Sequence, residues 1–143
     1  MLSANDIAKY FLTLTDEECG DNISNLKLQK LLYYAQGFHL AIYGKPLFDE
    51  PIHAWQHGPV VEAIYHRYKK HGANAIPVPK AVDFTKYPKD VRELLEDIYE
   101  VYGQYSATKL RNLTHDEPPW KDAEDGAEIP HKAMKQFFET RLA

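Results

Sequence analysis

The chain has 143 residues, of which 44% are hydrophobic and 13% aromatic, and its formal net charge is −4. This size and composition are typical of one folded domain with a single hydrophobic core, and they exclude an intrinsically disordered chain. The acidic balance disfavours nucleic-acid binding through phosphate neutralisation, and the single cysteine, Cys19, excludes a disulfide within the chain and fits a reducing compartment. No stretch resembles a secretion signal or approaches the roughly 18–20 apolar residues of a membrane span. We therefore expect a cytoplasmic protein with one domain over residues 1–143.

A short helix is predicted close to the N-terminus. Ser3 can cap its first turn, and Asp6 places a favourable negative charge there. Its apolar face recurs at helical spacing through Ile7, Tyr10, Phe11 and Leu14. An acidic loop over residues 16–22 follows it.

The clearest helical pattern covers residues 26–43. One face is formed, at spacings of three and four residues, by Leu28, Leu31, Leu32, Ala35, His39 and Ile42. The opposite side is also apolar, with Tyr33, Tyr34, Phe38, Leu40 and Ala41. A helix that is apolar nearly all round is typical of a central helix packed on several sides, and Gly37 within it indicates close approach of a second backbone. Gly44 predicts its end.

The polar residues of this helix lie at its start, in Lys27, Gln29 and Lys30. One interpretation is a solvated first turn. Cations are disfavoured near a helix N-terminus, so the alternative is that the lysines meet a partner carboxylate or form an exposed recognition edge. Lys27 and Lys30 are therefore candidate partner-binding residues.

A change of periodicity after the central helix predicts a short β-hairpin over about residues 46–56. Its first strand would contain Leu47 and Phe48, and its second strand would run from Ile52 to Gln56. Gly58-Pro59 then predicts the start of another helix, with proline at the first helical position, and Gly72 predicts its end.

The C-terminal half is predicted to be helical with irregular connections. Residues 73–88 form a proline-rich connector over the core edge, a helix spans 88–103, and Ser106 caps a further short helix. Residues 114–120 are expected to form a tight loop and the acidic residues 122–128 a mobile one. Pro130 begins a last helix. The expected fold is mainly α, a single-domain bundle of about six helices around the central helix, with one hairpin.

Histidines and acids suggest two sites for chemistry, and neither is convincing. Glu62 and His66 are four residues apart on one predicted helix face, which could hold a metal. No third ligand is fixed by the sequence, and an exposed helix pair is the simpler explanation. His115 next to Asp116 has the spacing of an oriented base, but no nucleophile motif accompanies it, and Cys19 lies in an acidic loop that would raise its pKa. We assign no catalytic residue, metal or cofactor, and do not expect an enzyme.

The two tryptophans lie in informative places. Trp55 stands beside His57 at a strand end, and Trp120 follows two prolines and His115 in a loop. Either ring could be buried in the core, but tryptophan is also enriched at the centres of protein interfaces. We expect the four residues to lie near each other or near an interface.

Three separated blocks of residues resemble one known family. The first block is Lys27-Leu28-Gln29-Lys30-Leu31 with Tyr33-Tyr34. The second is Ala54-Trp55 with Gly58-Pro59-Val60 and Tyr65. The third is Ser106, Leu110, Thr114-His115, Pro118 and Trp120. In these blocks the chain is similar to the Panacea domain, the family of SocA-like antitoxins and GepA-type phage-associated proteins. Where this chain has Glu62, the family pattern often has proline, which makes Glu62 a poor candidate metal ligand.

The resemblance implies a protein that binds and neutralises a toxin protein encoded beside it. Some members instead act as adaptors that deliver the toxin to a AAA+ protease. The candidate partner-binding residues are Lys27, Lys30, Trp55, His57, His115 and Trp120. Two other hypotheses stay open. One is a metal-assisted hydrolase that uses His57, Glu62, His66 and His115. The other is a DNA-binding autoregulator, which the acidic charge disfavours. The sequence leaves the oligomeric state undetermined.

Overall fold

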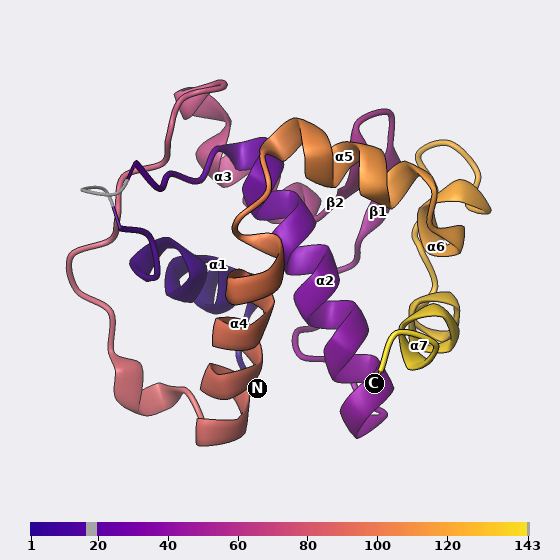
Figure 1. The fold of residues 1–143 in the computed structure, drawn as a ribbon, viewed down its shortest axis with the longest axis horizontal. Helices are drawn as coiled ribbons and strands as arrows, with labels where there is room; N and C mark the ends of the chain where they lie inside the picture. Colours follow the sequence, from indigo (N-terminus) through magenta and orange to yellow (C-terminus); the bar gives the residue numbers. More distant parts are fainter. Residues whose placement is uncertain (17–19, 143) are drawn as a thin grey trace.

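Helix α2 (Asn25–Tyr43) runs through the middle of the molecule, and the other elements are arranged around it (Figure 1). The computed structural model describes residues 1–16 and 20–142, so Cys19 lies outside the described residues. Within them, seven α-helices and one two-stranded sheet form a mainly α fold, as predicted. The side chain of Ser24 accepts a hydrogen bond from the Lys27 N–H at the start of α2, and Gly44, with φ of 72°, ends the helix. The predicted limits of 26–43 are therefore correct to one residue.

Four longer helices cover α2: α1 (Ala4–Thr13), α4 (Lys89–Tyr102), α5 (Ala107–His115) and α7 (His131–Glu139). In Figure 1, α1 and α4 lie on one side of α2, α7 lies on the other, and α5 crosses its N-terminal half. The predicted N-caps are present, with a full capping box at Ser3 and Asp6 and a side-chain cap at Ser106. These N-caps could be predicted because each depends only on residues within one helical turn.

Gly37 marks a close approach, but to a side chain and not to a backbone. A Cβ atom built on Gly37 would lie 2.1 Å from Cε2 of Phe138 on α7. The Phe138 ring, which is fully buried, therefore lies directly against the α2 backbone. Its edge also contacts Tyr33, with ring centroids 5.4 Å apart. The glycine thus fixes where α7 packs.

The hairpin lies further along the chain than predicted. Strand β1 (His53–Trp55) pairs antiparallel with β2 (Gly58–Val60), with Ala54 opposite Pro59. The prediction of 46–56 was wrong because Leu47 and Phe48 are buried without strand pairing, and Gly58-Pro59 belongs to β2 and not to a helix start. Gly58 has a φ of 111°, a left-handed value that glycine adopts easily, and here it begins strand β2. Helix α3 begins at Glu62 and ends at Tyr68.

The expected loop at 114–120 contains a seventh helix, the short α6 (Pro118–Lys121), which begins with proline at its first position. The expected mobile loop at 122–128 is instead hydrogen-bonded to β1. The Ala54 N–H donates to the Ala127 carbonyl at 2.8 Å, and the Gly126 N–H donates to the Ala54 carbonyl at 2.7 Å. This segment therefore pairs with the edge of the sheet, which its acidic composition did not indicate.

The connector between α3 and α4 contains two 3₁₀ helices, η2 (Lys69–His71) and η3 (Phe84–Lys86). It covers the core edge as predicted: Ile76 and Tyr87 are buried, and the Tyr87 hydroxyl donates to the Asp6 carbonyl at 2.6 Å. Among the described helices, none combines the length and the apolar character needed to cross a membrane.

Candidate functional site

The two candidate lysines of α2 are buried, although the sequence placed them at the surface. Lys27 Nζ donates to the Gly103 carbonyl at 2.6 Å, and Lys30 Nζ donates to the Pro59 carbonyl at 2.9 Å. Lys30 is 0% exposed and Lys27 9%. A buried ammonium needs an acceptor, and these acceptors lie 76 and 29 residues away in the sequence. The lysines therefore hold the end of α4 and strand β2 in place from inside.

Two glutamines of α2 bind other segments in the same way. The Gln29 side-chain oxygen accepts the Val61 N–H at 2.8 Å, just before α3. The Gln36 side chain accepts the Leu47 N–H at 2.7 Å and donates to the Phe48 carbonyl at 2.8 Å. Much of the polar part of the first motif block thus positions the backbone of the neighbouring segments.

Lys30 lies directly under the hairpin and α5. A Cβ atom on Gly58 would lie 2.6 Å from Lys30 Cε and 2.9 Å from Thr114 Oγ1, so only glycine fits at this turn position. Burial, with a smaller contribution from the Arg111 guanidinium, lowers the pKa of Lys30 to about 7. The hairpin therefore rests on a buried amine that lacks an ion pair within the described residues.

Above Lys30, the four candidate tryptophan and histidine residues come together. Trp120 Nε1 donates to the Trp55 carbonyl at 2.8 Å, and the Trp120 ring stacks on His115 with centroids 4.0 Å apart. Arg111 Nε donates to His57 Nδ1 at 3.1 Å. Burial and the nearby Arg111 charge lower the pKa of His115. The hairpin, α5 and α6 thus form one connected surface, which we call the hairpin–α5 face.

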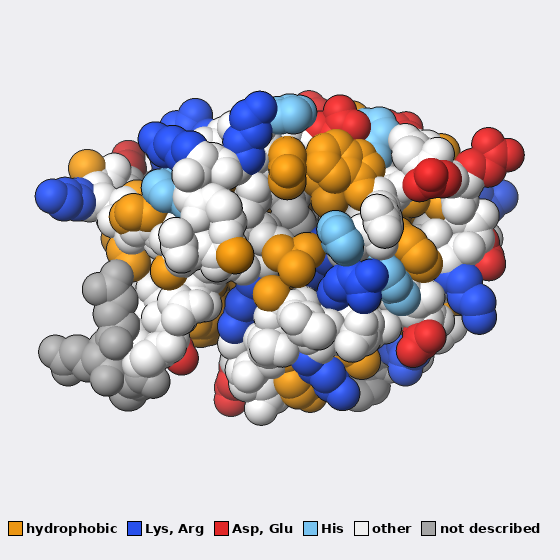
Figure 2. Space-filling model, turned by 90° about the horizontal axis from the view of Figure 1, so that it is seen from above, with side chains coloured by type: hydrophobic (Ala, Val, Ile, Leu, Met, Phe, Trp, Pro, Cys, Tyr) orange, Lys and Arg blue, Asp and Glu red, His pale blue; other side chains and the backbone are white. Residues whose placement is uncertain are grey.

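A pocket of about 530 Å³ opens on this face beside Trp55. The Trp55 ring meets the Tyr65 ring edge-on, with centroids 4.9 Å apart. Other residues that line the pocket include Leu26, Gln56, His57, Val60, Lys69 and Ala73. Figure 2, which looks onto the molecule from above, shows hydrophobic side chains gathered at the middle of this side, with histidine and basic side chains next to them. Such a mixture of aromatic surface and donors suits recognition of another molecule.

The candidate metal pair gathers no further ligands. Glu62 Oε1 accepts a hydrogen bond from Trp55 Nε1 at 3.3 Å and lies 3.9 Å from His53 Nδ1. Among residues 1–16 and 20–142, no group of three or more His, Cys, Asp or Glu side chains is placed to hold a metal ion. Glu62 therefore orients the Trp55 ring, and His66 lies on the exposed side of α3.

Sequence reasoning missed two residues of the site. Arg111 could have been found, because it lies four residues before His115 on the same helix face. Glu117 could not, because its partners are distant: its carboxylate accepts hydrogen bonds at 3.0 Å from the hydroxyl groups of Tyr33 and Tyr34. Burial raises the pKa of Glu117 to about 7.

The sequence profile of the family described as "Antitoxin SocA-like, Panacea domain" matches residues 28–121. The chain belongs to this family. The match begins in α2 and ends at the last residue of α6, so it includes the whole hairpin–α5 face and confirms the resemblance seen in the three motif blocks. Helices α1 and α7 lie outside the matched part of this SocA-like domain.

Among curated proteins, the chain is similar to Antitoxin SocA of Caulobacter vibrioides (strain NA1000 / CB15N), with 33% identity over 104 residues. The alignment covers 65% of this chain and 55% of the relative, so this SocA-like chain spans about half the length of the curated relative. No solved structure matches the chain.

Proposed function

We propose that this protein is an antitoxin that binds and neutralises a toxin protein encoded beside it. The observation that carries the proposal is the family match over residues 28–121, together with the name of the curated relative. The chain's net charge of −4 also suits an encounter with a basic partner, because opposite charges speed and orient association.

The hairpin–α5 face is the proposed binding surface, with Trp55, His57, His115 and Trp120 as its contact residues. His57 is exposed, and the other three side chains are half-buried. Their positions are fixed by hydrogen bonds and ring stacking, so little conformational entropy would be lost when a partner binds. Rigid aromatic side chains beside a pocket are typical of the residues that dominate binding energy. Lys30 supports this surface from inside through its hydrogen bond to Pro59, whereas Lys27 holds the end of α4.

The proposal is tested by expressing the product of the adjacent gene with and without this protein. We expect the neighbour to stop growth alone, and we expect growth to recover when a stoichiometric complex of the two proteins can be purified. Rescue in which the neighbour disappears unless a AAA+ protease is deleted would replace neutralisation by binding with delivery for degradation. No toxicity and no complex would refute the antitoxin role.

The surface is tested by Trp55→Ala against the matched control Phe84→Ala. Both changes truncate an aromatic side chain, but Phe84 lies on η3 against Tyr10, with ring centroids 5.9 Å apart, and is 46% exposed. Truncation of a central interface tryptophan costs about 2 kcal/mol or more, which is roughly 30-fold in Kd. We expect that loss for Trp55→Ala alone. Equal affinities for the two folded variants would exclude the hairpin–α5 face.

A further inference from the structure

A second hollow lies between α6 and α7, which stand next to each other at the edge of the molecule in Figure 1. Its volume is about 620 Å³. Its floor and walls are formed mainly by small or rigid apolar residues: Pro118, Pro119, Ala123, Ala127, Pro130, Ala133 and Phe137. We call it the α6–α7 groove.

Helix α7 has a fully buried apolar side and a second, half-buried apolar side. Met134 and Phe138 are fully buried against the core. Ala133 and Phe137, which are four residues apart, are half-buried and line the groove. Phe137 also packs against the core, and the Arg141 guanidinium lies 4.9 Å from its ring centroid. A helix with a second apolar side that its own chain covers only in part is typical of a surface that binds another chain.

The rim of the groove is acidic. Residues 121–128 contain four acidic residues and one lysine, and Asp122, Glu124 and Glu128 all line the groove. These three side chains are exposed, and within the described residues they form no ion pair. The rim is held by the backbone bonds to β1 given above and by the Ile129 N–H, which donates to the Ile52 carbonyl at 2.7 Å. The acids therefore surround an apolar floor at fixed positions.

The α6–α7 groove is continuous with the hairpin–α5 face. A smaller hollow between the hairpin and α6 is lined by Ala123, which also lines the groove. The same hollow shares Gln56 and Asp125 with the Trp55 pocket. One partner could therefore occupy all three hollows together.

We propose that the α6–α7 groove binds a segment of the toxin protein that presents an apolar side chain flanked by lysine or arginine residues. The apolar floor takes the side chain, and the unpaired carboxylates of the rim take the cations. The proposal rests on the proposed antitoxin function. The rim from Asp122 onward and all of α7 lie outside the matched residues 28–121, so most of the groove is not part of the shared domain. The groove would thus help to determine which toxin this chain accepts.

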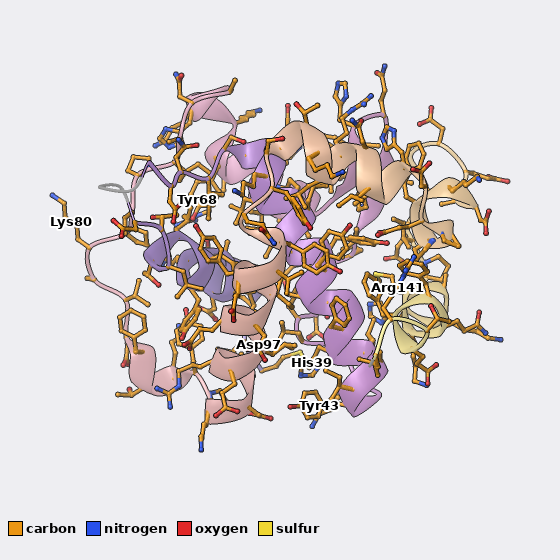
Figure 3. All side chains as sticks on the ribbon, viewed as in Figure 1. His39, Tyr43, Tyr68, Lys80, Asp97 and Arg141 are labelled. Carbon is orange, nitrogen blue, oxygen red and sulfur yellow. The ribbon has the colours of Figure 1, made fainter. Side chains whose placement is uncertain are left out.

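Charge reversal tests the rim. The double variant Asp122→Lys/Glu124→Lys is compared with Asp97→Lys/Glu100→Lys, which makes the same change in net charge on the exposed side of α4. Asp97, labelled in Figure 3, lies across α2 from the groove. Affinity for the toxin is measured at several salt concentrations. We expect the Kd of the groove variant to be at least tenfold higher at low salt and to depend less on salt concentration. The Kd of the α4 variant should stay within about threefold of that of the unmodified chain. Equal losses in both variants would overturn the proposal, because net charge alone would then explain them.

Filling the groove tests the floor. Ala133→Leu places a larger side chain in the hollow on a residue with good helix propensity, so the fold should be retained, and thermal unfolding checks this. We expect at least tenfold weaker binding from this variant as well. Unchanged binding by a folded Ala133→Leu would overturn the groove while leaving the antitoxin role intact. Failure of the unmodified chain to bind the neighbouring gene's product would refute the antitoxin role and this inference with it.

Discussion

Replacement of Lys30 by methionine should stabilise the protein at neutral pH and remove a strong pH dependence. Lys30 is fully buried under the hairpin, and its ammonium has one carbonyl acceptor, that of Pro59 at 2.9 Å. Burial lowers the pKa of Lys30 to about 7, whereas the unfolded chain keeps the ordinary value of 10.5. Methionine has a similar length and flexibility and carries no charge.

The size of the effect follows from this difference in pKa. Between pH 7 and pH 10.5 the unfolded state binds more protons than the folded state, so the free energy of unfolding rises with pH at up to about 1.4 kcal/mol per pH unit. At pH 7 the buried lysine costs about 4 kcal/mol, and by pH 9 this cost falls to about 2 kcal/mol. Lys30→Met removes the cost but leaves the Pro59 carbonyl without its donor, a loss of about 1–3 kcal/mol. We therefore expect a net gain of about 2 kcal/mol at pH 7 and almost none at pH 9.

The assay is urea unfolding at pH 7, 8 and 9. The control is Lys80→Met, a change at an exposed lysine that projects from the connector in Figure 3. The unmodified chain and the Lys80 variant should become more stable by roughly 2–3 kcal/mol over this range. Lys30→Met should show a much smaller rise, contributed by Lys27, whose pKa burial also lowers. Parallel pH profiles for all three proteins would refute the reasoning, because the buried amine would then not be the group that titrates.

Three further changes test other parts of the core. Gly37→Ala should destabilise the fold by about 1–3 kcal/mol in thermal unfolding, because its Cβ would overlap the Phe138 ring, and a variant of normal stability would mean that α7 packs elsewhere. Glu117→Gln should abolish a loss of about 2 kcal/mol in stability as pH rises from 5 to 7, because burial raises the pKa of Glu117 to about 7 and folding is favoured while Glu117 is protonated. Chemical unfolding at pH 5 and pH 7 measures this loss. Gln29→Leu should cost about 1–3 kcal/mol by leaving the Val61 N–H without an acceptor and Asn25 Oδ1 without its donor, and chemical unfolding measures this.

The parts of the fold that could be predicted from the sequence are those that local chemistry determines. The limits of α2 follow from its apolar pattern and from Gly44, and the start of α5 follows from the cap at Ser106. The tryptophan and histidine candidates were found by residue type, since such side chains are common at interfaces. The structure brings these four residues together, and their role in binding stays a proposal.

The remaining features depend on contacts between distant residues. The hairpin was misplaced because Leu47 and Phe48 look like a strand, while their backbone partner is the side chain of Gln36. Lys30 was expected at the surface because no acidic partner for it is evident in the sequence. Its acceptor is the backbone carbonyl of Pro59, 29 residues away, and a backbone carbonyl leaves no mark in a sequence. The order of segment 122–128 likewise depends on its pairing with β1, which a count of its acidic residues does not show.

The glutamines of α2 also restrict the motion of two loops, one around Leu47 and one around Val61. The amide protons of Leu47 and Val61 lie outside helices and strands, yet their acceptors are the side chains of Gln36 and Gln29 in the central helix. These amides can exchange with solvent only when the segment leaves α2 or α2 itself opens, so their exchange should be as slow as that of amides in the helical core. The loops are thus part of one cooperative unit, and opening of either loop alone is not a low-energy fluctuation. The segments around Leu47 and Val61 should therefore be as rigid as the core beneath them.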